Sequence, residues 1–429
     1  MQTHEDRLTA ALAHIDEDEL CDLALQLTAI PSPTGEEGEV GEFIVSWLRA
    51  AGVHAFTQEV EDGRVNAVGV VPGEASGTSL MFNGHLDTGA PIPHELAAPG
   101  VAGQPDELME PHREGGILYG TGMDNMQSGL AAIMGAAVAC HRSGVQLHGD
   151  VIIAGVCGEM GVAPIDQYQG RRYRAKGVGT RHLLTHGVVS DYAVVADGSH
   201  FGLTWAECGV VYAKVSTAGR PLYTPFTRRA IDAKDSDNAI IQMTQLIGEI
   251  ETWAMEFESR NVFRFEAGEI HPRVSIGAIS GGVPFKVAVA PLGCSIYVDI
   301  RMPPGMRPIE AMREFRAVVD VASVDARVEF YVSQQGYVGE GIEPIAEAIA
   351  DAHERVTGAT LKTIAPMMTS MWTDTNIYNE VGIPAVKFGI GAVLVERDGR
   401  TELIPHTTSV EDLLAATRIY TATALRMCA

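Results

Sequence analysis

The first two hundred residues alternate between short apolar runs and amphipathic segments, and this alternation limits the fold more than any other feature. The runs "AVGVV", "TSLMFNGH" and "GDVIIAGVCGE" are typical of buried strands. The segments "EVGEFIVSWLRAAG", closed by Gly52, and "NMQSGLAAIMGAAVACHRSG" have the apolar spacing of helices. Strands that alternate with helices predict an α/β domain with a mostly parallel sheet and helices on both faces.

The pattern changes near Val211. From there the chain predicts the order strand, helix, strand, strand, helix, strand, which is the β-α-β-β-α-β order of a ferredoxin-like α+β domain. The α/β pattern resumes at about Gly336. Since 429 residues exceed a single compact core, we expect one domain from 1–210 and 336–429, and a second, inserted domain at 211–335.

Charge and composition exclude several functions. The chain has 55 acidic and 31 basic residues, a net charge of -24, which argues against a nucleic-acid partner. The N-terminal stretch lacks the pattern of a signal peptide, and no apolar run is long enough to span a membrane. The six cysteines are scattered without a CxxC pair, so we expect reduced thiols and a cytoplasmic protein.

Polar residues stand at the ends of the apolar runs or in glycine-rich turns. The candidates of this kind are His85, Asp87, Asp124, Glu159, Asp197 and His406. In open α/β sheets, ligands gather at the carboxyl ends of strands. Imidazole and carboxylate groups together suit one or two divalent ions, Zn²⁺, Mn²⁺ or Co²⁺. Any one of these residues alone is more often the polar end of a strand; their joint order predicts a metal site.

Several motifs resemble one family over almost the full length of the chain. "NGHLDT", "GTGMDNMQSGLAA", "YVDIRMPPG" and "DTNIYNEVGIPAVKFGIG" are similar to those of the aminoacylase, acetylornithine deacetylase, succinyl-diaminopimelate desuccinylase and carboxypeptidase G family of two-metal hydrolases. The resemblance implies that the inserted domain serves as a lid and dimerisation domain.

The resemblance also implies a ligand set. Asp124 would bridge two metal ions. His85 and Asp197 would complete one site, and Glu159 with His406 the other. Asp87 would accept the second N–H of His85 and fix its tautomer.

Two departures from the family concern its catalytic groups. The family carries two adjacent glutamates, a general base and a metal ligand, but here only Glu159 is present and Gly158 precedes it. Glu159 falls at the ligand position, although a shift of one residue would make it the base. Tyr223 stands where the family has a lid-domain histidine that stabilises the oxyanion, and a tyrosine hydroxyl can also donate a hydrogen bond.

A third departure is an insertion, "IDQYQGRRYRAKGVGTRHLL", with six basic residues in an otherwise acidic chain. It is either a solvated loop or a region that recognises a carboxylate or nitro group. Arg301 matches a family arginine that contacts a substrate carboxylate, or it pairs with Asp299. The cluster "MMTSMWTDTNIY" offers Trp372 for an apolar substrate pocket, or it fills the core.

These features predict a metal-dependent hydrolase that cleaves a C–N bond in a small carboxylate-bearing substrate through an activated water. The alternatives are an aminohydrolase that removes the amino group of an activated aromatic amine, as in nitroanthranilate chemistry, and a silent metal- or ligand-binding relative. The expected partners are a small-molecule substrate and a second copy of the chain, because a long amphipathic helix and a free sheet edge favour pairing into a dimer.

Overall fold

The computed structural model describes residues 3–74, 77–89, 109–364, 368 and 370–429. The chain divides into two compact units. The first contains the residues up to Trp205, the stretch from Gly339, and the C-terminal part from Thr373. The second runs over Ala206–Val338 and includes a short segment that ends at Trp372. The sequence analysis placed its boundaries at 211 and 335 and did not anticipate this separate segment.

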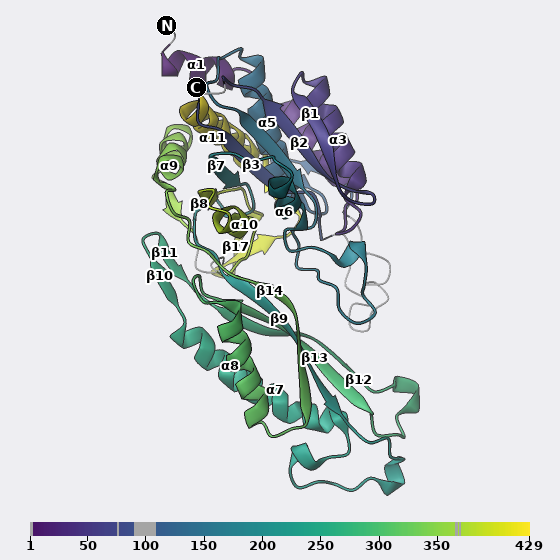
Figure 1. The fold of residues 1–429 in the computed structure, drawn as a ribbon. Coiled ribbons are helices and arrows are strands. Elements are labelled where there is room, and N and C mark those ends of the chain that lie inside the picture. The colour runs from purple at the N-terminus through teal and green to yellow at the C-terminus, as the bar shows by residue number, and fades with distance from the viewer. Residues whose placement is uncertain (1–2, 75–76, 90–108, 365–367, 369) are drawn as a thin grey trace. The chain divides into compact units, whose positions relative to one another are not determined.

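A six-stranded sheet forms the centre of the first unit (Figure 1). Its strands, in spatial order, are β1 (His54–Glu61), β2 (Arg64–Val71), β6 (Val151–Val156), β3 (Leu80–His85), β7 (Tyr192–Val195) and β16 (Ala385–Lys387). The strands from β6 to β16 are parallel to one another, whereas β1 and β2 are antiparallel to their neighbours. The α/β class is confirmed, with a mixed sheet that is parallel where the polar strand ends lie.

Helices cover both faces of this sheet, because successive strand residues point to opposite sides. Ile153 packs into the larger core and Ile152 into the smaller one. The larger core contains residues of α1 (His4–Leu12), α2 (Glu17–Ala29), α3 (Gly38–Ala50), α5 (Ser128–Arg142), α9 (Glu343–Thr357) and α11 (Val410–Cys428). The smaller one contains residues of α6 (Val178–Thr185) and α10 (Thr375–Glu380).

Among the described residues, three small sheets accompany the central sheet of the first unit. They are β4 (His112–Glu114) with β5 (Ile117–Tyr119) and β19 (Thr407–Ser409), β17 (Val393–Arg397) with β18 (Arg400–Ile404), and β8 (Gly202–Leu203) with β15 (Lys362–Thr363). The pairing of β5 with β19 continues into a hydrogen bond of 3.0 Å from the Gly120 amide to the His406 carbonyl. The loop after β5 therefore lies against His406.

The second unit has a four-stranded antiparallel sheet with two helices. Its elements in chain order are β9 (Gly209–Ala218), α7 (Ala239–Arg260), β12 (Arg273–Gly281), β13 (Gly293–Met302), α8 (Pro308–Val321) and β14 (Ala326–Gln334). A hairpin, β10 (Phe263–Phe265) with β11 (Gly268–Ile270), follows α7. The sheet order is β12-β13-β9-β14. Alternate residues of β13, among them Ile296, Val298 and Ile300, form the core with Leu246 and Phe315 of the helices.

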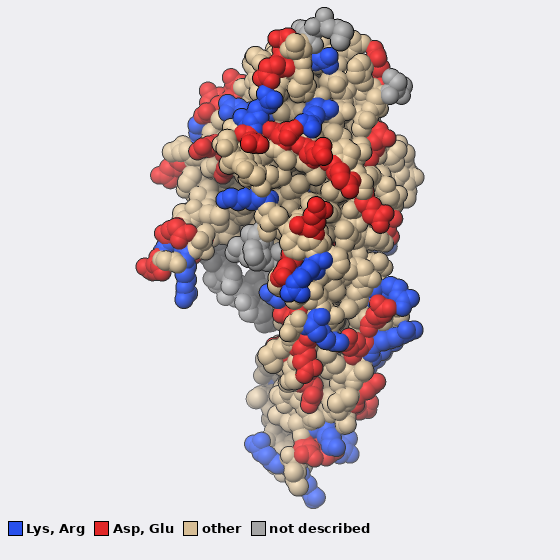
Figure 2. Space-filling view, turned by 90° about the vertical axis from the view of Figure 1, so that its left-hand side faces the viewer, with Lys and Arg blue, Asp and Glu red and all other residues tan. Residues whose placement is uncertain are grey.

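Within the described residues, no helix combines the length and the apolar character needed to cross a bilayer. Figure 2 shows acidic and basic side chains interspersed on the face in view.

Candidate metal centre

Three of the predicted residues follow three adjacent parallel strands. His85 ends β3, Glu159 lies three residues after β6, and Asp197 lies two residues after β7. Since the spatial order is β6, β3, β7, the three side chains leave the sheet at one edge, with His85 in the middle. All three are buried. The ends of these adjacent parallel strands lie side by side, although His85 and Glu159 are 74 positions apart in the sequence and Glu159 and Asp197 are 38 apart.

Both ring nitrogens of His85 have close neighbours. Nδ1 lies 2.7 Å from the backbone carbonyl oxygen of Asp87, and Nε2 lies 2.8 Å from Oδ1 of Asn125. Burial lowers the pKa of His85, but the negative charges of Glu159, Asp87 and Asp197 outweigh it and raise this pKa to about 9. An imidazolium can donate to both oxygens at once. The imidazolium of His85 thus contacts two neutral oxygens and has carboxylates around it.

Asp87 differs in detail from the expectation. Its carboxylate is 3.7 Å from Nδ1 of His85, and its backbone carbonyl makes the hydrogen bond instead. The carboxylate accepts the amide N–H groups of Glu159 and Met160, at 3.0 and 3.1 Å, and the hydroxyl of Thr34 at 2.8 Å. Asp87 thus orients His85 through its main chain and fixes the turn that carries Glu159 through its side chain.

Asp124 and Asn125 are adjacent in the tight turn Met123–Gln127, but their side chains contact different partners. Asp124 accepts the His406 amide N–H at 3.2 Å, and its carboxylate is 3.9 Å from Nδ1 of the His406 ring. Burial raises the pKa of Asp124. The Asp124 carboxylate therefore lies beside His406, whereas the side chain that contacts Nε2 of His85 is the amide of Asn125. The sequence analysis missed Asn125, because a turn without periodicity does not reveal which of two adjacent side chains faces a partner.

Gly158 cannot carry a side chain in this structure. Its φ of +68° is in the left-handed region, and a Cβ atom there would lie 2.5 Å from Nη2 of Arg64 and 2.6 Å from Cγ1 of Val178. A glutamate at this position would need the surrounding segments to move. The space beside Glu159 that a second glutamate would fill is occupied by the backbone and side chains of other segments.

Arg64 anchors the basic insertion beside Gly158 through hydrogen bonds to its backbone. Its guanidinium is fully buried, donates to both oxygens of Glu37 at 2.8 and 2.6 Å, and donates to the carbonyls of Arg171 and Arg174 at 2.7 and 2.6 Å. Nothing in the short stretch around Arg64 marked it as a core residue. Its extensive hydrogen bonding explains how a buried arginine is tolerated.

Most of the basic side chains of the insertion form exposed ion pairs. Arg171, Arg172, Arg174 and Arg181 pair with Asp62, Glu36, Glu61 and Glu380, respectively. The ring of His182 stacks on that of His186, with 3.7 Å between centroids. These five side chains fit a solvated loop. Lys176 is the exception, because it is buried.

Asp374 is a further buried carboxylate that the sequence analysis did not select. It precedes α10 without capping it by its side chain, and its Oδ2 accepts the Thr180 hydroxyl at 2.6 Å. No hydrogen-bond partner for Oδ1 lies among the described residues. Burial raises the pKa of Asp374 to about 6, against the opposing effects of the Thr180 hydrogen bond and the His85 charge. Its sequence context, an aspartate before a six-residue helix, resembles an ordinary helix cap.

Burial also raises the pKa of Glu159, to about 8, although the positive charges of His85 and Lys176 act in the opposite direction. The negative charges of Asp197 and Asp374 add to the increase. Together with Glu159 itself, three carboxyl groups thus share two positive groups, His85 and Lys176. A bound cation would reverse this balance and favour the ionised carboxylates.

The donor set suits a divalent cation in its chemistry. Imidazole nitrogen and carboxylate oxygen are ligands for Zn²⁺, Mn²⁺ and Co²⁺, and the excess of buried carboxylates favours positive charge. In the described part of the chain, however, no three His, Cys, Asp or Glu side chains converge closely enough to enclose an ion. Binding at His85 requires Nε2 to lose its proton and Asn125 to move aside.

The second unit contains the other predicted residues. Arg301 donates from Nε to both oxygens of Asp299, at 2.9 and 3.0 Å, which is the pairing weighed in the sequence analysis. Tyr223 is 55% exposed and packs its ring near Phe226. Trp372 is buried, and Met367 of the same cluster lies outside the described residues. These observations leave their contacts with substrate as predictions.

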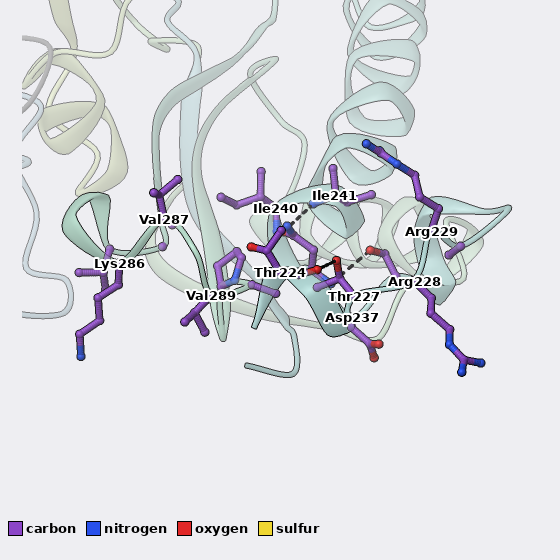
Figure 3. Close-up of a pocket in the computed structure, with 18 of the residues that line it drawn as sticks. Thr224, Thr227, Arg228, Arg229, Asp237, Ile240, Ile241, Lys286, Val287 and Val289 are labelled. Carbon is purple, nitrogen blue, oxygen red and sulfur yellow. Dashed lines mark hydrogen bonds between the residues drawn. The ribbon is translucent and has the colours of Figure 1, made fainter. Parts of the chain in front are cut away.

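A cavity of about 580 Å³ lies in the second unit, and none of its lining residues belongs to the first. Its walls include Ile240, Val287 and the N-terminal turn of α7. Figure 3 shows that the charged ends of Arg228, Arg229 and Lys286 extend outward from the other lining side chains. None of the residues at the strand ends lines this cavity.

The sequence profile of the peptidase family M20/M25/M40 matches residues 81–426. The chain belongs to this family. The match includes β3, β6, β7 and the segment of His406, so all five candidate ligands lie within it.

Among curated M20 relatives, N-formyl-4-amino-5-aminomethyl-2-methylpyrimidine deformylase of Halalkalibacterium halodurans is 25% identical, over 89% of each chain. Succinyl-diaminopimelate desuccinylase of Gluconacetobacter diazotrophicus is 24% identical, over 93% of this chain and 94% of its own. Both names describe hydrolysis at a C–N bond. The chain is thus similar over about nine tenths of its length to a deformylase and a desuccinylase.

Solved structures agree on the M20 fold. Human carnosine dipeptidase 1 superposes with a TM-score of 0.69 at 16% identity, and the match covers 100% of this chain and 99% of that one. The YXEP protein of Bacillus subtilis, described as a dinuclear metal-binding peptidase of the M20 family, gives a TM-score of 0.61 at 15% identity, with 95% and 97% covered. At these identities the likeness concerns the fold.

Proposed function

We propose that the chain is a metal-dependent hydrolase that cleaves a C–N bond, other than a peptide bond, in a small carboxylate-bearing substrate. The observation that carries this proposal is the buried cluster of His85, Glu159 and Asp197 at the carboxyl ends of three adjacent parallel strands. A divalent cation, when bound there, supplies an activated water and compensates negative charge that develops on the substrate.

In this proposal the protein groups have separate tasks. His85 and Asp197 hold the cation, and Asp87 keeps His85 and the Glu159 turn in place through its carbonyl and carboxylate. Gly158 leaves no side chain at the position where the family has its base, so Glu159 is the carboxylate available to accept a proton. The raised pKa of Glu159, about 8 without a cation, suits proton exchange near neutral pH.

The second unit supplies the groups proposed to recognise the substrate. Arg301 would bind the substrate carboxylate after exchange with Asp299, which now occupies its Nε group. Tyr223 would donate a hydrogen bond to the developing oxyanion, and Trp372 would contact the apolar part of the substrate. These assignments rest on the family resemblance together with the side chains that stand at those positions.

Product release from a panel of compounds tests this function. Chelator-treated protein, with and without Mn²⁺, Zn²⁺ or Co²⁺, is incubated with N-formyl amines, N-acyl amino acids and amino-nitrobenzoates, and free amine or ammonia is measured. We expect cation-dependent release of amine from at least one carboxylate-bearing amide. Ammonia from amino-nitrobenzoates alone would favour the aminohydrolase alternative. If no combination of compound and cation releases amine or ammonia, the result would contradict the proposal and favour a silent binding relative.

We also propose that the chain pairs with a second copy through the second unit. Strand β12 lies at the edge of its sheet, and Ile279, Phe285 and Val287 near its end are 59%, 83% and 88% exposed. Light scattering at micromolar concentration should give twice the mass of one chain for the wild type. The Phe285→Asp variant should give the mass of a single chain. Val321→Asp, at an exposed site on α8, is the control. A monomeric wild type would contradict pairing.

A further inference from the structure

Lys176 is held beside Glu159 by the backbone of the insertion. The amide of Gly177 donates to the carbonyl of Gly158 at 2.9 Å, so the residues on either side of this hydrogen bond, Lys176 and Glu159, are neighbours. Arg64 fixes the preceding part of the insertion through two carbonyls. The position of Lys176 follows from the fold of the first unit.

The conformation of Lys176 is unusual for an exposed loop lysine. The residue is only 6% exposed, and its φ of +56° lies in the left-handed region that a lysine seldom adopts. A buried ammonium requires negative charge nearby. The hydrogen bond between Gly177 and Gly158 places the carboxyl of Glu159 within electrostatic range of this ammonium.

On the other side of the cluster, the described side chain that contacts Nε2 of His85 is neutral. The side chain at Nε2 of His85 is the neutral amide of Asn125, and the Asp124 carboxylate accepts the amide N–H of His406. In two-metal sites the ions lie roughly 3.5–4 Å apart, and an anion between them reduces their repulsion. A neutral amide does so poorly, and a neighbouring ammonium adds to the repulsion.

We propose that the ammonium of Lys176 takes the place of one of the two metal ions, so that the site holds a single divalent cation near His85 and Asp197. Glu159 then pairs with Lys176 and remains a carboxylate available to the substrate. This inference rests on the proposed function in that a divalent cation binds at the strand ends. It explains together the insertion, the absence of a side chain at Gly158 and the amide at Asn125.

Calorimetric titration of the chelator-treated full chain with Mn²⁺ at pH 8, checked by elemental analysis, tests the number of ions. We expect one Mn²⁺ per chain for the wild type. Lys176→Met removes the charge and preserves most of the volume, so Glu159 becomes free to bind a second ion and the stoichiometry should approach two. Lys176→Arg retains the charge and should stay at one. Arg172→Met, an exposed residue of the same insertion, should also stay at one.

Glu159→Gln provides a second approach that does not depend on the folding of the Lys176→Met variant. If Glu159 pairs with Lys176, this substitution leaves one Mn²⁺ per chain with an affinity within about threefold of the wild type. Two ions in the wild type, no binding, or an unchanged stoichiometry in a folded Lys176→Met variant would each overturn the inference. One ion that responds as expected, without hydrolysis of any compound, would overturn the proposed function alone.

Discussion

Two buried charged clusters among the described residues of the first unit differ in how fully their charges are matched. Around Arg64, the guanidinium meets both oxygens of Glu37 and two backbone carbonyls at distances of 2.6–2.8 Å. Around His85, the carboxylates of Glu159, Asp197 and Asp374 outnumber the nearby positive groups, and Oδ1 of Asp374 has no hydrogen-bond partner among the described residues.

This difference separates a structural role from a binding role. A cluster whose donors and acceptors are matched internally has nothing left to offer a ligand, so its contribution is to the fold. A cluster with excess negative charge stores unfavourable energy that a cation can relieve on binding. The two clusters are connected, since Arg64 anchors the insertion that carries Lys176 to Glu159.

The largest expected effect comes from breaking the matched cluster. Arg64→Met leaves the buried carboxylate of Glu37 without its partner, and the free energy of unfolding should fall by about 3–5 kcal/mol. Urea denaturation monitored by circular dichroism measures it. Arg172→Met, which removes an exposed partner of Glu36, should cost less than about 1 kcal/mol. Equal losses for the two variants would show that Arg64 is not a structural anchor.

The second effect concerns pH at the unmatched cluster. The pKa of His85 is raised to about 9, so its proton must leave before Nε2 can bind a cation. The apparent affinity for Mn²⁺ should therefore rise about tenfold per pH unit between pH 6 and 8 and level off above about pH 9. Calorimetry at constant ionic strength measures this dependence. An affinity that is constant from pH 6 to 8 would rule out a protonated His85 in the free protein.

The smallest expected effect is on stability, at two carboxylates whose pKa values are shifted in opposite directions, Asp374 and Asp191. The raised pKa of Asp374, about 6, means that its charged form destabilises the fold and that this cost appears as pH rises through 6. Asp374→Asn should then stabilise the cation-free protein by about 2–3 kcal/mol at pH 8 and by little at pH 4.

Asp191 is the matched control. Hydrogen bonds from the amide and hydroxyl of Ser79 lower its pKa, so its charged form contributes stability that is lost as pH falls below its ordinary value. Asp191→Asn should therefore destabilise the protein slightly at pH 8. Stability changes of the same sign in both variants would contradict the distinction.

Much of this arrangement could be predicted from the sequence, because it follows from regular structure. Apolar runs identified β3, β6 and β7, and parallel strands bring their carboxyl ends to one edge. His85, Glu159 and Asp197 were found in this way. The absence of a second glutamate at Gly158 was also visible, and the structure adds its cause in the left-handed backbone and the proximity of Arg64.

The remaining features depend on contacts between distant segments, which a local pattern does not encode. Asn125 and Asp124 are adjacent in a turn, and only the fold decides that Asn125 meets His85. Lys176 resembles any other residue of a basic loop in the sequence, and only the fold shows that Arg64 and the Gly158 carbonyl hold the backbone on either side of it, at Arg174 and Gly177. Asp374 was hidden because its burial comes from helix packing and its hydrogen bond from Thr180.

The central claim is that the unmatched cluster at the strand ends binds a divalent cation through His85. Titration of chelator-treated wild-type protein and His85→Ala with Mn²⁺ at pH 8 tests it most directly, with circular dichroism to verify that the variant is folded. We predict saturable binding by the wild type and an affinity lower by more than about 100-fold in the variant. Equal affinity in both proteins would contradict the claim.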